Sequence, residues 1–181
     1  MKEATNTSSR VLSGAVVGLE ARLVEVEVDI ALGLHSFTIV GLPGVAVKES
    51  KQRIGAAIKN IGLKPPRRSH AITVNLAPAD LEKQGPAYDL PLALGFLLSS
   101  QQLTSETPNH IFAGELSLNG EVRPITGVLP LAILAKEKNK ELFAKAKEDG
   151  REFGLSSVRD YRRAAEQIRI FVAGKMARLI S

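Results

Sequence analysis

Hydrophobic and polar residues alternate strictly in one segment near the N-terminus of the chain. The apolar positions of this segment are Val24, Val26, Val28 and Ile30. A period of two with β-branched residues on one side predicts a half-buried strand at 23–30. Two flanking apolar runs predict further strands at 11–18 and 36–40. The chain is therefore expected to begin with three consecutive strands.

After Gly44 the spacing of the core-facing positions changes to three or four residues. These positions are Val47, Ser50, Ile54, Ile58 and Ile61. Such spacing predicts a helix with a narrow apolar stripe. Gly62 and the Pro65-Pro66 pair end this helix, because proline lacks an N–H donor and favours extended backbone before it. A strand is predicted next, at 71–76.

The second half of the chain alternates apolar helices with short strands. An apolar helix is predicted at 90–98, with Asp89 as its N-cap. Asn119-Gly120 supplies the positive φ angles of a tight turn and predicts a hairpin of strands 111–118 and 121–125. The remaining elements are expected as a helix at 129–138, short strands at 142–144 and 157–161, and a closing helix at 164–172. This order predicts an α+β fold, a two-layer sandwich with a mixed sheet and helices mainly on one face.

Length and composition favour one domain. With 181 residues and 44% hydrophobic content, we expect a flexible leader at 1–9, a single domain at 10–175 and a tail at 176–181. The absence of cysteine excludes disulfides and thiolate metal sites. No apolar run reaches the ~18 residues of a membrane span, and residues 1–10 lack the apolar core of a signal peptide. A cytoplasmic protein without membrane contact is predicted.

Basic residues gather on the predicted helix and in the loop that follows it. They are Lys48, Lys51, Arg53, Lys59, Lys64, Arg67 and Arg68. Such a cluster could follow a phosphate backbone or contact a protein partner, and the net charge of +5 permits a polyanion. An ordinary solvated face is the alternative. Arg162, Arg163 and Arg169 form a second group, and neither group has the interleaved aromatic residues of single-strand binding proteins.

Metal and nucleotide sites are not predicted. Glu25, Glu27 and Asp29 share one strand face, but their spacing of ~6.6 Å is too wide for one hard cation, which holds oxygens at ~2.1–2.5 Å. These acids are expected to form a solvated face or to meet a basic partner. The three histidines, His35, His70 and His110, are expected at the surface or in turns. The glycines at 41–44 lack the Walker A spacing, so no ATP hydrolysis is expected.

Several longer motifs carry a resemblance to a known family. They are Ile-Val-Gly-Leu-Pro at 39–43, Val-Lys-Glu-Ser at 47–50, Val-Asn-Leu-Ala-Pro-Ala-Asp-Leu at 74–81, Lys83, and Tyr-Asp-Leu-Pro at 88–91. In this order they resemble the N-terminal domain of the magnesium-chelatase-like AAA+ proteins, the ComM/YifB family, over roughly residues 10–172.

Two further motifs resemble the Lon-type Ser-Lys peptidase fold, of the ribosomal-protein-type β-α sandwich. They are Gly-Pro-Ala-Tyr-Asp-Leu-Pro at 85–91 and Gly-Glu-Leu-Ser-Leu-Asn-Gly-Glu-Val-Arg-Pro-Ile at 114–125. The resemblance implies that Ala87 stands at the place of the nucleophile and Leu129 at the place of the lysine. A Ser-Lys pair needs a hydroxyl and a neutral amine within hydrogen-bond reach. We therefore expect a Lon-like domain without catalysis.

Four residues near these motifs are expected to have structural roles. Tyr88 is predicted to pack in the core with its hydroxyl bonded locally, and Lys83 to be a loop cation. Asn75 and Asp80 are predicted to hold the loop at 77–84 through hydrogen bonds to the backbone.

The resemblance implies a platform domain of a AAA+ motor in DNA processing, of the branch migration kind that serves competence-type recombination. Its expected partners are the motor domain of the same protein, further copies in a homo-oligomer, and DNA. ATP and Mg are expected only for the motor module, and no cofactor or enzymatic activity for this chain. The alternatives are a cryptic Ser/Lys-type peptidase and a purely structural oligomerisation module.

Overall fold

A computed structural model describes residues 8–67, 69–103 and 109–144 of the chain. Within them, the elements are β1 (Ser8–Val17), β2 (Glu20–Leu32), β3 (Ser36–Val40), α1 (Val45–Asn60), β4 (His70–Ala77), the 3₁₀ helix η1 (Pro86–Tyr88), α2 (Asp89–Ser99), β5 (His110–Phe112), β6 (Glu115–Leu116), β7 (Val122–Arg123), α3 (Val128–Glu137) and β8 (Glu141–Phe143). The strand and helix predicted at 157–161 and 164–172 lie outside the described residues.

One six-stranded sheet has the order β3-β4-β2-β1-β5-β8, and β6 and β7 form a separate two-stranded hairpin. β2 runs antiparallel to both of its neighbours, while the other pairs in the sheet are parallel. The expected α+β fold with a mixed sheet is confirmed. β1 already begins at Ser8, inside the segment predicted as a leader.

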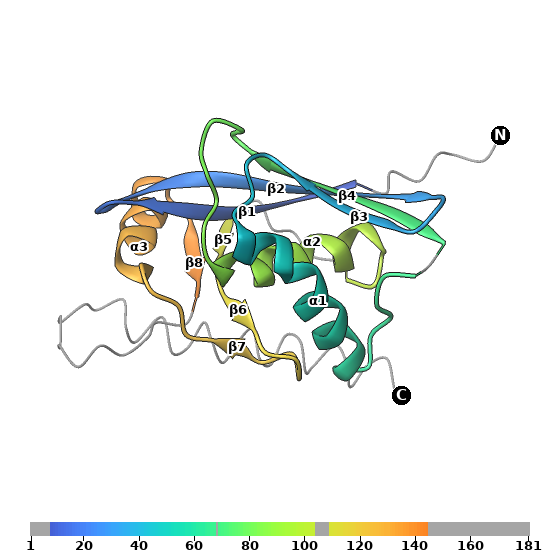
Figure 1. The fold of residues 1–181 in the computed structure, drawn as a ribbon. Coiled ribbons are helices and arrows are strands. Elements are labelled where there is room, and N and C mark those ends of the chain that lie inside the picture. The colour runs from blue at the N-terminus through green and yellow to red at the C-terminus, as the bar shows by residue number, and fades with distance from the viewer. Residues whose placement is uncertain (1–7, 68, 104–108, 145–181) are drawn as a thin grey trace.

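The alternation predicted for the second strand decides how the layers pack. Val24, Val26 and Val28 are at most 1% exposed and lie in the main core cluster, together with residues of α1 and α2. Figure 1 shows α1 and α2 beneath the long strands of the sheet, which run across the top of the view. These two helices cover one face and bury it from water, which is the main stabilising contribution of the fold.

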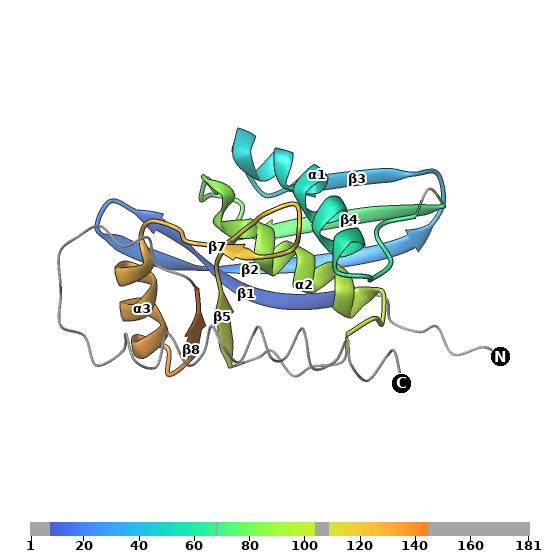
Figure 2. The ribbon, with the colours of Figure 1, turned by 90° about the horizontal axis from the view of Figure 1, so that it is seen from below.

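The third helix lies on the opposite face, at one end of the sheet. Leu12 packs with Ile111 and Leu134 in a second cluster, whereas Val11 belongs to the main core. Because successive residues of a strand point to opposite faces, α3 and α2 cover different faces here. Figure 2 shows the two helices on opposite sides of β5. Two of the three helices therefore share one face, as predicted.

The strand predicted at 111–118 is interrupted at Gly114. β5 joins the large sheet and β6 joins the small hairpin. A Cβ atom at Gly114 would lie 2.7 Å from Val122 Cγ1, and its backbone bonds to Ala87 and Leu90 instead of to a neighbouring strand. The close approach of three segments at this glycine ends the first strand.

Candidate functional site

A cleft of about 660 Å³ lies beside Ala87. Its lining residues are Gly14, Ala15, Val16, Val17, Leu81, Glu82, Gln84, Gly85, Pro86, Ala87, Tyr88, Glu115, Pro124, Ile125, Thr126, Gly127 and Leu131. They come from the end of β1, the segment before α2, β6, the loop before α3 and α3 itself. The cleft is thus formed by segments that are far apart in the sequence.

Local backbone geometry places Ala87 at this cleft. Gly85 has φ of 77°, and η1 then leads directly into α2. The Ala87 carbonyl accepts a hydrogen bond from the Gly114 N–H at 2.7 Å, and the Gly114 carbonyl accepts one from the Leu90 N–H at 3.0 Å. This pair of bonds fixes the start of α2 against the break between β5 and β6.

The two positions expected from the resemblance at the place of a peptidase pair differ in their relation to the cleft. Ala87 lines it, whereas Leu129 lies in the first turn of α3 with 47% exposure and does not line it. Among the described lining residues, Thr126 alone carries an aliphatic hydroxyl and none carries an amine. This lining contains no Ser-Lys pair.

Tyr88 is buried, as predicted, but its hydroxyl is not bonded locally. The side chain is 1% exposed, and its hydroxyl has no hydrogen-bond partner in the described part of the chain. Burial disfavours the charged phenolate and raises the pKa of Tyr88 far above its usual value near 10. Tyr88 is therefore a neutral core residue that is unsuited to act as a nucleophile.

Lys83 lies in the loop between β4 and η1, as predicted, but it is fully buried. Its ammonium donates to the carbonyls of Gly41 and Leu76, both at 2.8 Å, and to that of Pro78. Burial lowers the pKa of Lys83, and the charge of Asp80 opposes this effect. The three carbonyls match the three donors of an ammonium group. Lys83 thus joins the ends of β3 and β4 to the loop before α2.

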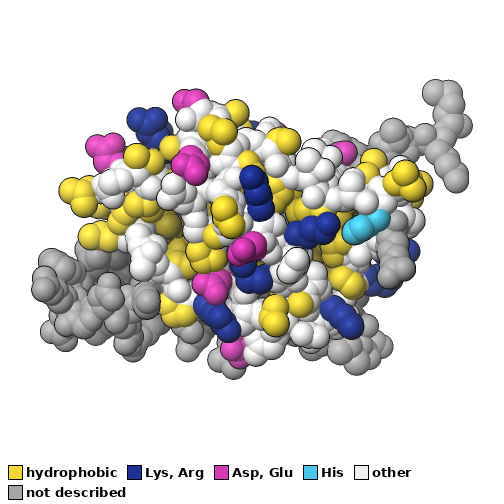
Figure 3. Space-filling view, viewed as in Figure 1, with side chains coloured by type: hydrophobic (Ala, Val, Ile, Leu, Met, Phe, Trp, Pro, Cys, Tyr) yellow, Lys and Arg dark blue, Asp and Glu magenta, His cyan; other side chains and the backbone are white. Residues whose placement is uncertain are grey.

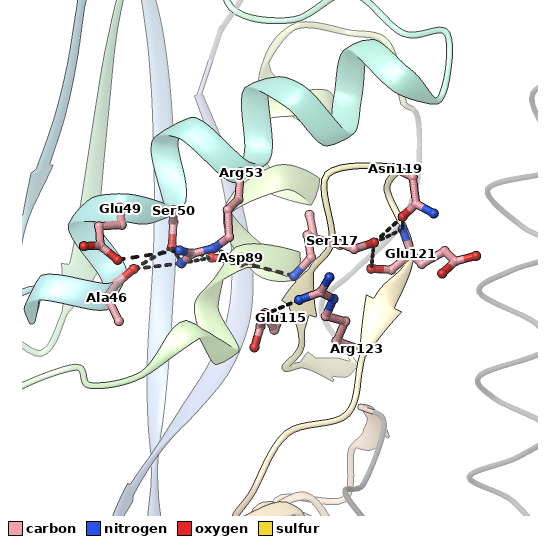
Figure 4. Close-up of polar contacts among 11 residues, drawn as sticks. Ala46, Glu49, Ser50, Arg53, Asp89, Glu115, Ser117, Asn119, Glu121 and Arg123 are labelled. Carbon is pink, nitrogen blue, oxygen red and sulfur yellow. Dashed lines mark hydrogen bonds and ion pairs between the residues drawn. The ribbon is translucent and has the colours of Figure 1, made fainter.

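Asp89 is not an N-cap, because it lies in a buried ion pair with Arg53. Arg53 donates from Nε to Oδ2 at 2.6 Å and from Nη2 to Oδ1 at 3.0 Å. Ser50 Oγ also donates to Oδ1, and the Leu116 N–H donates to Oδ2 at 3.1 Å. Figure 4 shows Ser50 and Arg53 of α1 meeting Asp89 at the start of α2. The carboxylate joins α1, α2 and β6.

Arg53 therefore differs from the other basic residues of the predicted cluster. Its side chain is 22% exposed, and Asp89 raises its pKa by accepting hydrogen bonds and by its negative charge. Sequence reasoning missed Ser50 and Asp89 as its partners. A polar Ser50 at a core-facing position of the helix was the available signal, because buried hydroxyls need partners.

The remaining described members of the basic cluster are exposed. They are Lys48, Lys51, Lys59, Lys64 and Arg67, which we call the basic surface. Figure 3 shows Lys and Arg side chains over the region of α1, with some carboxylates between them. Lys51 Nζ lies 5.9 Å from the centre of the Phe37 ring. Arg68 and the second basic group at 162–169 lie outside the described residues.

Two residues of the acidic row of β2 pair with neighbouring side chains. Glu25 accepts from Arg10 at 2.8 Å, and Glu27 accepts from Asn75 Nδ2 at 2.8 Å. No group of three potential ligand side chains is found among the described residues. The prediction that the Asn75 side chain holds the following loop is wrong, because this side chain joins β4 to β2.

The histidines occupy different positions. His35 is exposed next to the turn before β3, and His70 begins β4. His110 is not a turn residue: it lies in β5 and contacts the rings of Phe112 and Phe143, at 5.9 and 5.0 Å between centroids. Its Nε2 is 3.4 Å from a carboxylate oxygen of Glu141.

Comparisons with known proteins identify relatives of this chain. The family model "Subunit ChlI of Mg-chelatase" matches residues 26–149. The competence protein ComM of Haemophilus influenzae is 45% identical over 148 residues, which are 81% of this chain and 28% of that protein. YifB of Escherichia coli is 43% identical over 143 residues, 78% of this chain and 28% of YifB. The chain thus spans little more than a quarter of these relatives.

None of the helices in the described segments combines the length and the apolar character needed to cross a membrane.

Replacing Arg53 by methionine should leave the Asp89 carboxylate buried without its cation. Breaking a buried pair in this way costs about 3–5 kcal/mol, and because Arg53 is partly exposed we expect a loss of about 3 kcal/mol in the free energy of unfolding. Urea denaturation followed by circular dichroism measures it. The matched control is Lys59→Met, which removes the same charge from an exposed site of α1. A loss no greater than that of the control would contradict the role of Arg53.

Replacing Tyr88 by phenylalanine removes a buried hydroxyl without a partner. Since an unsatisfied buried group costs about 1–3 kcal/mol, the variant should be more stable at neutral pH by about 1 kcal/mol. Above pH 10, Tyr88 ionises in the unfolded wild type but stays protonated in the folded state. The free energy of unfolding of the wild type therefore falls, and the stability difference between the variant and the wild type widens. Urea titrations from pH 7 to 11 test this. A less stable variant would show that the hydroxyl has a partner.

Proposed function

This chain belongs to the family of subunit ChlI of magnesium chelatase, and on that premise we propose that it is a non-catalytic platform domain for a AAA+ motor that acts on DNA. The observation that carries the proposal is the basic surface on α1 and the loop after it. Five exposed cations on adjoining segments can each neutralise a phosphate, with release of counterions. One relative is named as a competence protein, which fits a role in handling DNA.

In this proposal, the motor module is a part of the protein outside this chain. The chain matches 28% of the length of two relatives, and the remainder of those relatives is long enough to hold an ATPase. ATP and Mg would bind there, since the loop at 41–44 lacks the Walker A spacing. Assembly as a homo-oligomer and a cytoplasmic location belong to the same proposal.

Packing in the described residues supports a rigid contact domain. The Arg53–Asp89 pair and Ser50 fix α1 against α2, and Lys51 lies over Phe37 of the neighbouring β3. The helix that bears three of the exposed lysines is therefore held in one orientation on the sheet. A preorganised surface loses less conformational entropy on binding.

Binding to DNA should weaken with salt and depend on the basic surface. The double variant Lys51→Glu, Arg67→Glu loses two phosphate contacts. The slope of the logarithm of the binding constant against the logarithm of the salt concentration should therefore become shallower by about 1.8 for duplex DNA. Fluorescence anisotropy of labelled duplex and single strands, measured across a salt series, tests this.

The matched control is Lys136→Glu, Lys138→Glu, which makes the same charge change at α3, at the other end of the sheet in Figure 1. Equal slopes for the two variants would show that the salt dependence reflects the net charge of the protein and not contacts of the basic surface. Binding no stronger than that of a neutral protein would remove DNA as a partner and favour an oligomerisation module.

The peptidase alternative requires a nucleophile at the cleft. With hydrocarbon at Ala87 and a buried neutral phenol at Tyr88, we expect no turnover of a casein-type substrate above the level of a buffer blank. Release of acid-soluble fragments measures turnover. Activity that Tyr88→Phe or Thr126→Val abolishes would overturn the non-catalytic assignment.

A further inference from the structure

We propose that the cleft at Ala87 binds an extended peptide with basic side chains, which pairs with the free edge of β1 at Gly14–Val17. This site differs in position and in charge from the basic surface.

Among the described residues, the end of β1 has an unpaired edge. β1 pairs with β2 from Ser8 to Val17, but on its other side it pairs with β5 only at Leu12. Within the described segments, no backbone hydrogen bond outside the β2 ladder involves residues 14–17. In an antiparallel ladder every second residue directs its N–H and C=O away from the partner strand. This edge therefore presents donors and acceptors to an incoming strand.

The cleft follows this edge. Gly14, Ala15, Val16 and Val17 all line it, although successive residues of a strand point to opposite faces. Leu131 of α3 and Tyr88, which belong to different core clusters, also line it. A cavity bordered by four consecutive residues of β1 follows the end of this strand along its length. An extended chain in the cleft would thus lie in the plane of the sheet, where backbone pairing is possible.

The walls of the cleft define the chemistry of the peptide. Glu82 and Glu115 line it, and its described lining contains no lysine, arginine or histidine. Arg123 lies 3.4 Å from Glu115 and offsets part of one charge, so the local charge remains negative in a protein of net charge +5. Val16 and Val17 are 42% and 49% exposed. Apolar side chains alternating with basic ones fit these walls, whereas DNA would be repelled.

Binding is tested with a fluorescein-labelled octapeptide of alternating valine and arginine, titrated into the full 181-residue chain at low ionic strength. The same peptide with every second amide N-methylated keeps its charges but cannot pair as a strand. We expect the N-methylated peptide to bind at least tenfold more weakly, and a valine–glutamate peptide not to bind. Amide hydrogen exchange should slow at residues 14–17 only with the first peptide.

Variants of the cleft separate this site from other acidic surfaces. Glu82→Gln, Glu115→Gln should reduce the affinity about fivefold. Glu121→Gln, Glu137→Gln, which removes two charges from exposed sites outside the lining, should leave it unchanged. The double variant Lys51→Glu, Arg67→Glu should still bind the peptide, because its changes lie outside the cleft. Loss of DNA binding and loss of peptide binding are therefore measured independently.

Equal affinity for the N-methylated peptide would overturn the proposal, since charge alone would then explain binding. Absence of binding by the valine–arginine peptide, or unchanged exchange at residues 14–17, would overturn it as well.

Discussion

The buried carboxylate of Asp89 is the interaction on which the arrangement of the helices depends. It accepts hydrogen bonds from Ser50 and Arg53 of α1 and from the backbone of Leu116 in β6. A charge without exposure is tolerated in a protein interior only when its oxygens are bonded and a cation is near. Apolar burial of α1 and α2 on the sheet is not directional. The carboxylate supplies direction, and with it one register of α1 on α2.

Both proposed surfaces follow from this arrangement. α1 carries exposed lysines, and the segment just before Asp89 forms a wall of the cleft. Cations therefore lie on the outside of the helical layer, while carboxylates and hydrocarbon line the cleft at the end of β1. The separation would let one small domain contact the two proposed partners, which carry opposite charges. It also explains why a net charge of +5 says little about either surface alone.

The sequence predicted those features that depend on local periodicity. The alternation in β2 and the three-to-four spacing in α1 each report a face that packs on the core, so strand, helix and fold class were predicted correctly. Lys83 could not be placed, because its partners are three backbone carbonyls that leave no side-chain signal. The break at Gly114 and the partner of Asp89 depend on segments distant in sequence. The apolar run of β1 likewise does not show that its second edge has no partner among the described residues.

The pairing of β1 also bears on the order in which the molecule assembles. The hairpin of β1 and β2 closes over two residues, whereas β1 meets β5 only after most of the described chain has been made. Contacts between distant segments carry the larger loop-closure entropy and form later. A nascent domain would hold its antiparallel hairpin while β5 was still unfolded. The unpaired edge of β1 at Gly14–Val17 begins next to this late contact with β5. The edge that is proposed to bind another strand would therefore also be open to wrong pairing for most of the synthesis of the domain.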